Sequence, residues 1–221
     1  MGQYTASHVN STDSGDTRPT ALQIVKDQGL EGKLAGRVIV ITDCTATGAT
    51  LLLTVRDLQK AEDILTDILE PIRVSLIQMD NTSFARVRAG AKTILVESNN
   101  QVNIVINNAG VMGIEEVTLT EDGHEVVFAT KHLAHFLLFQ LLKPALLASS
   151  NPDFNSRVVN VATSSHRLTT INPSDNYNIE KGGYSHALGY AQSKAATVYM
   201  SSMLWLVPAT GDKKTHSLST R

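Results

Sequence analysis

Two residues of the segment YAQSK, Tyr190 and Lys194, have types and a spacing that can do chemistry. They stand four positions apart, so on a helix both side chains emerge on one face, one turn from each other. An ammonium beside a phenol favours the ionised form of the phenol, which suits the pair to general acid and base catalysis. Tyrosine and lysine also occur at this spacing on solvated helices, so the interpretation needs support from other segments.

Two polar segments elsewhere in the chain supply that support. INNAG (106–110) follows an apolar run, and its glycine lets the backbone approach a flat ligand closely. RVVNVATSSHR (157–167) places small hydroxyl residues just beyond another apolar run. Ligands of open α/β sheets bind beyond the carboxyl ends of the strands, so both segments are expected to line a ligand site.

Apolar runs alternate with helix-like segments, and these elements must position the polar residues. The runs VIVIT, TLLLTV, VSLIQM, VNIVI and RVVNV are apolar almost throughout, as in strands that are buried on both faces. The alternation predicts an α/β fold with a parallel sheet covered by helices. The polar stretch 168–187 is expected to cover a pocket, because loops of this length are usually functional. We expect strands at 38–42, 51–55, 73–79, 103–107 and 157–162, and helices at 58–69, 83–97, 119–147 and 188–204, after a short helix from Ala21.

Length and composition indicate one domain and disfavour several kinds of partner. The 221 residues suit a single domain at 21–221, after a polar and disordered tail at 1–20. A net charge of -2 gives no basic field for nucleic acid. The apolar run 133–147 is shorter than the roughly 20 residues that a membrane span needs. The lone Cys44 cannot form an internal disulfide, so a reducing, cytoplasmic setting is expected.

The segments VIVIT, INNAG, RVVNVATSSHR and YAQSK, in this order, resemble the short-chain dehydrogenase/reductase family. The resemblance covers most of residues 34–204 and is strongest to the branch with retinol-dehydrogenase-like and fungal secondary-metabolite reductases. Members have a Rossmann-type doubly wound parallel sheet and pass hydride between NAD(P)H and a carbonyl or alcohol. The resemblance therefore implies an NADP-dependent oxidoreductase that acts on a secondary metabolite or lipid-like carbonyl.

The resemblance also implies roles for single residues of the catalytic site. Tyr190 corresponds to the acid that protonates the carbonyl oxygen. Lys194 corresponds to the cation beside it, which also binds the nicotinamide ribose. The serine of the family falls on Thr163, with Ala162 before it and Ser164 as the alternative hydroxyl.

Cofactor-binding positions follow in the same way. Asn108, Ala109 and Gly110 correspond to the residues that line the adenine side of the cofactor. Asp80 in QMDNTS corresponds to the acidic residue that contacts the adenine. Arg56 follows the second strand, where a guanidinium would bind the 2′-phosphate that NADP has and NAD lacks. This favours NADP, with NAD as the alternative. Arg56 can also be a solvated charge at the end of the strand, without a role in binding.

One helix departs from the family pattern. Lys131 in ATKHLAHF replaces an asparagine, and an ammonium cannot copy the paired donor and acceptor of an amide. Its charge is also expected to repel Lys194. His132 and His135 lie three positions apart on the same helix, but nothing supplies further ligands, so we interpret them as packing residues and expect no metal.

The segment after the first strand departs further. The glycine-rich turn that receives the cofactor pyrophosphate in the family corresponds here to DCTATGAT, with Asp43 in place of the first glycine. The first crossover helix is expected to be missing, so cofactor binding should be impaired. Because only residues 43–49 join the first two strands, we expect an antiparallel hairpin or a displaced strand at a fragile sheet edge. The C-terminal substrate-binding part, from the sixth strand on, is also expected to be lacking.

Two alternative functions follow from these departures. The chain can be a catalytically inactive remnant that acts as an association module, with the helices 119–147 and 188–204 as a homodimer surface. It can also be a lyase or cyclase that uses Tyr190 as an acid and has discarded the cofactor. Saturable cofactor binding would favour the reductase over the inactive remnant. Turnover that does not depend on the cofactor would favour the lyase or cyclase over the reductase.

Overall fold

The computed structural model describes residues 34–41, 49–65, 74–173, 175–206 and 219–220. The tail and the first helix predicted within residues 1–33 lie outside this part of the chain. The described strands are β1 (Val38–Ile41), β2 (Thr50–Val55), β3 (Val74–Gln78), β4 (Ile104–Asn107), β5 (Arg157–Asn160) and β6 (Ser219–Thr220). The helices are α2 (Leu58–Leu65), α3 (Phe84–Glu97), α4 (Val126–Phe128), the π-helical turn η3 (Ala129–Leu133), α5 (Ala134–Ser149), the 3-10 turn η4 (Ser164–Arg167) and α6 (His186–Leu206).

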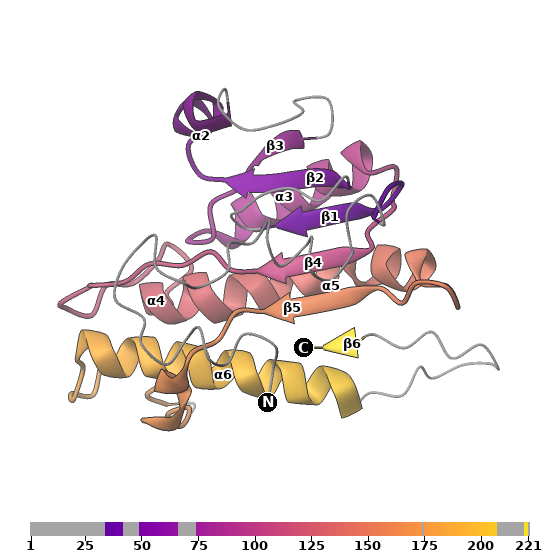
Figure 1. Ribbon diagram of the computed structural model, residues 1–221. Coiled ribbons are helices and arrows are strands. Elements are labelled where there is room, and N and C mark those ends of the chain that lie inside the picture. The colour runs from indigo at the N-terminus through magenta and orange to yellow at the C-terminus, as the bar shows by residue number, and fades with distance from the viewer. Residues whose placement is uncertain (1–33, 42–48, 66–73, 174, 207–218, 221) are drawn as a thin grey trace, which may run out of the picture.

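The described strands form one sheet in the order β3-β2-β1-β4-β5-β6, and every neighbouring pair is parallel. Figure 1 shows α3 and α5 side by side across one face of this sheet, and α6 alongside β5. The chain winds outward from β1 in both directions, first through β2 and β3 and then through β4 and β5. This arrangement confirms the predicted Rossmann-type, doubly wound α/β fold.

The first two strands differ from the prediction. β1 and β2 pair in parallel, with Val38 opposite Thr50 and Ile41 opposite Leu53, and both lie inside the sheet. The predicted hairpin, displaced strand and edge position are therefore wrong. A link over residues 42–49 reaches up to about 27 Å when extended, and a short strand such as β1 is only about 13 Å long. The chain can therefore return to the start of a parallel neighbour even without a crossover helix.

The long helix expected from residue 119 begins at Val126, later than predicted. A β-bridge between Leu119 and Glu125 closes a turn just before it. The Glu125 carboxylate accepts hydrogen bonds from the backbone N–H groups of Val127 and Phe128, at 2.9 and 2.8 Å, and thereby caps the helix. No helix in the described ranges is long and apolar enough to cross a membrane.

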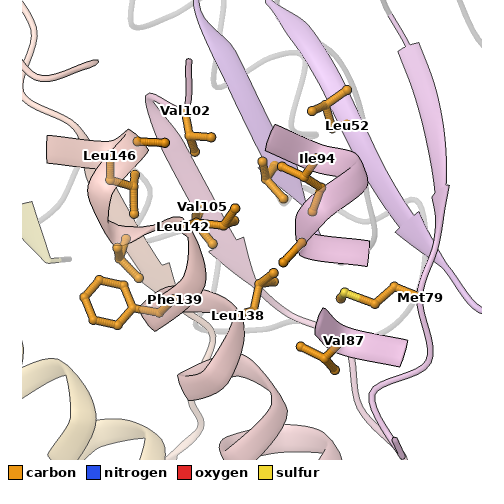
Figure 2. Packing of buried hydrophobic residues seen from close by; sticks show 14 of the residues in the cluster. Leu52, Met79, Val87, Ile94, Val102, Val105, Leu138, Phe139, Leu142 and Leu146 are labelled. Carbon is orange, nitrogen blue, oxygen red and sulfur yellow. The ribbon is translucent and has the colours of Figure 1, made fainter. Parts of the chain in front are cut away.

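The core fills both faces of the central strands. Figure 2 shows Ile94 of α3 and Leu138, Leu142 and Leu146 of α5 against Val105 of β4. Alternate strand residues face the other side of the sheet, so both faces are buried, as the continuous apolar runs predict. The cluster on that second face contains Ile39, Ile41, Leu51, Leu53 and Ile104.

A sixth strand is present, contrary to the expectation that the chain stops before it. Ser219 and Thr220 form β6, which pairs in parallel with Arg157 and Val158 of β5. The expectation failed because so short a strand has no apolar periodicity of its own and depends on the pairing edge that β5 offers.

Candidate functional site

The carboxyl ends of the parallel strands meet along one edge of the sheet. The segments that follow β2, β3, β4 and β5 all begin there. β1 lies between β2 and β4, where the chain changes winding direction, and this switch point is where open α/β sheets bind ligands. The segment 42–48, which holds Asp43 and continues from β1 at the switch point, lies outside the described residues.

Tyr190 and Lys194 lie on α6 as the spacing predicts. The Lys194 Nζ atom is 5.9 Å from the centroid of the Tyr190 ring. The same ammonium donates a hydrogen bond of 2.5 Å to the backbone oxygen of Val161, just beyond β5, and this contact places it at the carboxyl edge. Burial, and secondarily the charge of Lys131, lowers the pKa of Lys194 from 10.5 to about 8.

Lys131 is the neighbour that completes this cluster. Its Nζ atom lies over the Tyr190 ring, 4.8 Å from the centroid, and thus closer to the ring than that of Lys194. A Cβ atom built on Gly110 would stand 2.1 Å from this Nζ, so a side chain at residue 110 would displace the amine. Burial lowers the pKa of Lys131. The predicted repulsion between the two lysines is therefore present in the structure.

The π-helical turn η3 gives Lys131 this position. π-helical turns widen the helix by one residue and are frequent at functional sites. The Lys131 carbonyl accepts hydrogen bonds from the His135 ring, at 3.0 Å from Nδ1, and from the Thr197 hydroxyl, at 3.5 Å. The His135 contact lies within the same continuous helix, whereas the Thr197 contact joins η3 to α6, and the two elements pack against each other. The lysine and the tyrosine therefore meet although they are far apart in the sequence.

His135 of this helix is buried and His132 is partly buried, and both are uncharged at neutral pH. Burial lowers the pKa of His132 and of His135 to about 4. His132 packs 5.2 Å from the ring of Phe128, which is a core contact. Within the described part of the chain, no group of three or more His, Cys, Asp or Glu side chains gathers in a way that could hold a metal ion.

The predicted hydroxyl donors stand next to this cluster. Thr163 follows β5 and caps η4, where its Oγ1 atom accepts a hydrogen bond of 3.5 Å from the backbone N–H of Ser165. η4 packs against α6. Ser164 is more exposed than Thr163. No hydrogen bond joins Thr163 or Ser164 to Tyr190 among the described residues, so neither hydroxyl has a fixed place in the cluster.

The predicted cofactor residues line the other half of the same edge. Arg56 follows β2 and is exposed. The Asp80 carboxylate, after β3, accepts hydrogen bonds from the backbone N–H and the hydroxyl of Thr82, at 2.9 and 2.8 Å. Residues 108–110 follow β4, and their first two side chains are partly buried. An exposed cation, a fixed carboxylate and a glycine-containing turn are the groups of this edge that could hold the adenosine half of a nicotinamide dinucleotide.

Residues of the predicted loop 168–187 line a cavity of about 230 Å³ together with α6. The prediction that this loop covers a pocket therefore agrees with the structure. Leu188 and Gln192 face this cavity, whereas Tyr190 is not among the lining residues. The buried Gln192 amide accepts a hydrogen bond from the N–H of Asn172, at 3.0 Å, and donates one to the carbonyl of Tyr177, at 2.7 Å. The cavity therefore lies on the opposite side of α6 from the tyrosine and lysine pair.

Sequence reasoning missed two contacts of α6. Lys131 was recognised as a departure, but its contact with the Tyr190 ring depends on how η3 packs on α6. Gln192 stands inside YAQSK but does not belong to the cluster: it holds the loop from the face opposite Tyr190, and this position on the helix was the signal for its role. The cluster of one phenol and two buried amines can move a proton to or from a carbonyl oxygen.

Comparison with known proteins agrees with this geometry. Residues 36–206 match the family model for short chain dehydrogenases. The chain is 39% identical over 230 residues to short-chain dehydrogenase/reductase prx1 of Penicillium rubens, a match over 99% of this chain and 66% of the relative. It is 38% identical over 239 residues to oxidoreductase calI of Penicillium decumbens, over 99% of this chain and 67% of that protein.

Solved structures agree as well. The RhlG/NADP active-site complex of Pseudomonas aeruginosa superimposes with a TM-score of 0.59 at 25% identity, over 78% of this chain and 67% of that chain. The chain spans about two thirds of the length of the Penicillium relatives that it matches. Because the family model covers everything from β1 to α6, the chain belongs to the short-chain dehydrogenase/reductase family.

Proposed function

We propose that the chain is an NADP-dependent oxidoreductase that interconverts a carbonyl and an alcohol on a secondary metabolite or lipid-like substrate. The observation that carries this proposal is the meeting of the Tyr190 phenol with the Lys194 ammonium at the carboxyl edge of the sheet. The family membership supports the same chemistry. We place the protein in the cytoplasm, because its single cysteine has no partner in the chain.

The residues of this chain act on the substrate oxygen and its proton. Bound NADPH supplies the hydride. Tyr190 donates a proton to the carbonyl oxygen, and Lys194 favours the phenolate that remains. Thr163 donates a hydrogen bond to the same oxygen, because its Oγ1 atom accepts from the Ser165 N–H and its own O–H stays available as a donor. The hydrogen bond from Lys194 to Val161 keeps the ammonium near the ring throughout.

Arg56 supports NADP over NAD. Its guanidinium is exposed after β2, and a guanidinium can bind the 2′-phosphate with two parallel hydrogen bonds. Asp80, Asn108, Ala109 and Gly110 hold the adenine side in this proposal. The Pseudomonas RhlG neighbour was solved with NADP.

Calorimetric titration of the full chain with NADPH and NADH tests this proposal. We expect saturable NADPH binding that Arg56→Gln weakens roughly tenfold to a hundredfold, because a charged hydrogen bond contributes about 1.5–3 kcal/mol. NADH binding should change little. Arg88→Gln is the matched control, since Arg88 is an exposed arginine of α3. Absence of saturable binding, on protein whose circular dichroism shows it to be folded, would reject the proposal.

A second copy of the chain is the partner that the exposed helix faces favour. Phe136 of α5 is 40% exposed, and Tyr199 and Met203 of α6 are 47% and 63% exposed, so large apolar side chains face outward on the two helices predicted to dimerise. We expect a dimer in sedimentation equilibrium that Tyr199→Ser weakens. Val96→Ser on α3, where Val96 is 70% exposed, is the control and should leave the dimer intact. A monomeric wild-type chain would contradict this assignment.

A further inference from the structure

The cavity between the loop 168–187 and α6 has no part in the proposed reduction. Its volume is about 230 Å³, and Gln192 reaches it from the face of α6 that points away from Tyr190. Pockets for drug-sized ligands begin at roughly 300 Å³, so a ligand of this cavity is small. None of the described lining residues has a charged side chain, so the ligand is also uncharged.

Three amide side chains bring unused hydrogen-bonding groups to the cavity. The buried Gln192 amide donates one hydrogen bond, to the Tyr177 oxygen, and keeps a second N–H. Asn176 accepts from the Lys181 N–H through Oδ1, at 2.9 Å, and among the described residues its Nδ2 group has no acceptor. Asn172 donates through Nδ2 to the Asn176 carbonyl, at 3.3 Å, whereas its Oδ1 atom has no donor in the same part of the chain. The cavity therefore offers both donors and acceptors.

The carboxylate and ammonium groups of the loop lie outside the cavity lining. Lys181 forms an ion pair with Asp175, and both side chains are largely exposed. The Glu180 carboxylate accepts a hydrogen bond of 3.1 Å from the Asn178 amide. None of these residues is among those that line the cavity. The charges of the loop are thus used in contacts of its own, and the cavity is left to neutral polar groups.

The backbone of the loop keeps the cavity open. Ile179 lines the cavity with a φ of 60° although it is only 4% exposed, and β-branched residues rarely adopt this left-handed conformation. Gly182 and Gly183 also have positive φ, and a Cβ atom on either would meet no atom within 4 Å. Backbone outliers of this kind cluster at ligand sites, where the surrounding structure holds them. The loop is therefore shaped around an opening next to α6.

We propose that this cavity binds a small, uncharged polyhydroxylated ligand, a free polyol of a few carbon atoms. A hydroxyl group both donates and accepts, so neighbouring hydroxyls of one ligand pair with the free Asn172 oxygen and with the free N–H groups of Asn176 and Gln192. The C–H side of such a ligand packs against Ile179 and Leu188, the two apolar side chains of the lining. The site is separate from Tyr190 and needs no nicotinamide cofactor.

Saturation-transfer difference NMR of the full chain with erythritol tests this proposal. The matched ligand is butane-1,4-diol, which has the same carbon chain without the two inner hydroxyl groups. We expect erythritol binding to saturate in the millimolar range, because a ligand of so few atoms has little contact surface. The diol should bind roughly tenfold more weakly, since each lost hydrogen bond weakens binding a few-fold. No saturable erythritol binding to the folded protein, or equal binding of the two compounds, overturns the proposal.

Two variants locate the binding in the cavity. Asn172→Ala removes the free oxygen but keeps the backbone N–H that donates to Gln192, and it should weaken erythritol binding roughly threefold to tenfold. Leu188→Trp fills the cavity and should weaken binding more strongly. Val96→Trp on α3 is the matched control, because Val96 is an exposed apolar residue outside the loop, and it should change nothing. Erythritol binding that both Asn172→Ala and Leu188→Trp leave unchanged lies elsewhere and overturns the proposal.

Discussion

Replacing Lys131 by methionine should stabilise the protein at neutral pH. Lys131 and Lys194 are 8% and 5% exposed and bring two like charges to one tyrosine ring. The fall of the Lys194 pKa from 10.5 to about 8 corresponds to roughly 3 kcal/mol. The Lys131 charge is the smaller of its two causes, so it accounts for about 1 kcal/mol, and the burial of Lys131 itself adds to this. We therefore expect Lys131→Met to raise the free energy of unfolding by about 1–2 kcal/mol at pH 7.

The gain should depend on pH with a defined sign. Below pH 8 the folded protein keeps the Lys194 charge, so the repulsion is fully present. Between pH 8 and 10.5 the unfolded chain binds a proton that the folded protein has lost, so the wild type gains stability as the pH rises and the advantage of the variant shrinks. Urea denaturation followed by far-ultraviolet circular dichroism at pH 7 and pH 10 measures both effects.

Lys92→Met is the matched control, because it removes one exposed positive charge from α3. It should change the free energy of unfolding by less than about 0.5 kcal/mol at either pH. The reasoning is refuted if Lys131→Met is no more stable than the wild type at pH 7. It is also refuted if the variant shows the same gain at pH 7 and pH 10.

Three other substitutions have expected outcomes. Glu125→Ala removes the acceptor of two backbone N–H groups at the start of α4 and should cost about 1–2 kcal/mol in urea denaturation, whereas an unchanged midpoint would rule out the cap. Leu142→Ala, at a fully buried position of α5, should cost about 2–5 kcal/mol in the same assay, and a cost below 1 kcal/mol would mean that this core is loosely packed. Gln192→Ala removes both hydrogen bonds from α6 to the loop, so limited trypsin digestion should cut faster after the exposed Lys181, and an unchanged rate would show that the loop is held by other contacts.

Much of the sheet could be predicted because its signals are local. Strands buried on both faces need apolar residues almost throughout, and the bounds of β1 to β5 agree with the five apolar runs to within two residues. Tyr190 and Lys194 share a helix, so their spacing alone places them on one face. The parallel pairing of β1 and β2 was missed because it depends on the neighbours β4 and β3, which hold both strands in register wherever the link runs.

The missed parts of the site depend on contacts between distant segments. The π-helical turn η3 has no sequence signal of its own, and its position is set by packing against α6. The meeting of Lys131 with Tyr190 follows from that packing. The late start of the helix at Val126 depends on Glu125, whose carboxylate caps it. The backbone N–H of Glu125 in turn donates a hydrogen bond of 2.8 Å to the Asn178 side-chain oxygen in the distant loop.

The proposed reduction requires Tyr190 to deliver a proton to a carbonyl oxygen beside bound NADPH. NADPH oxidation, followed at 340 nm with a panel of lipid-like ketones in wild type and in Tyr190→Phe, measures this step. We expect turnover of at least one ketone that falls roughly a hundredfold or more in the variant, with NADPH affinity unchanged. Turnover that survives the loss of the phenol, or no NADPH consumption by folded wild-type protein, would contradict it.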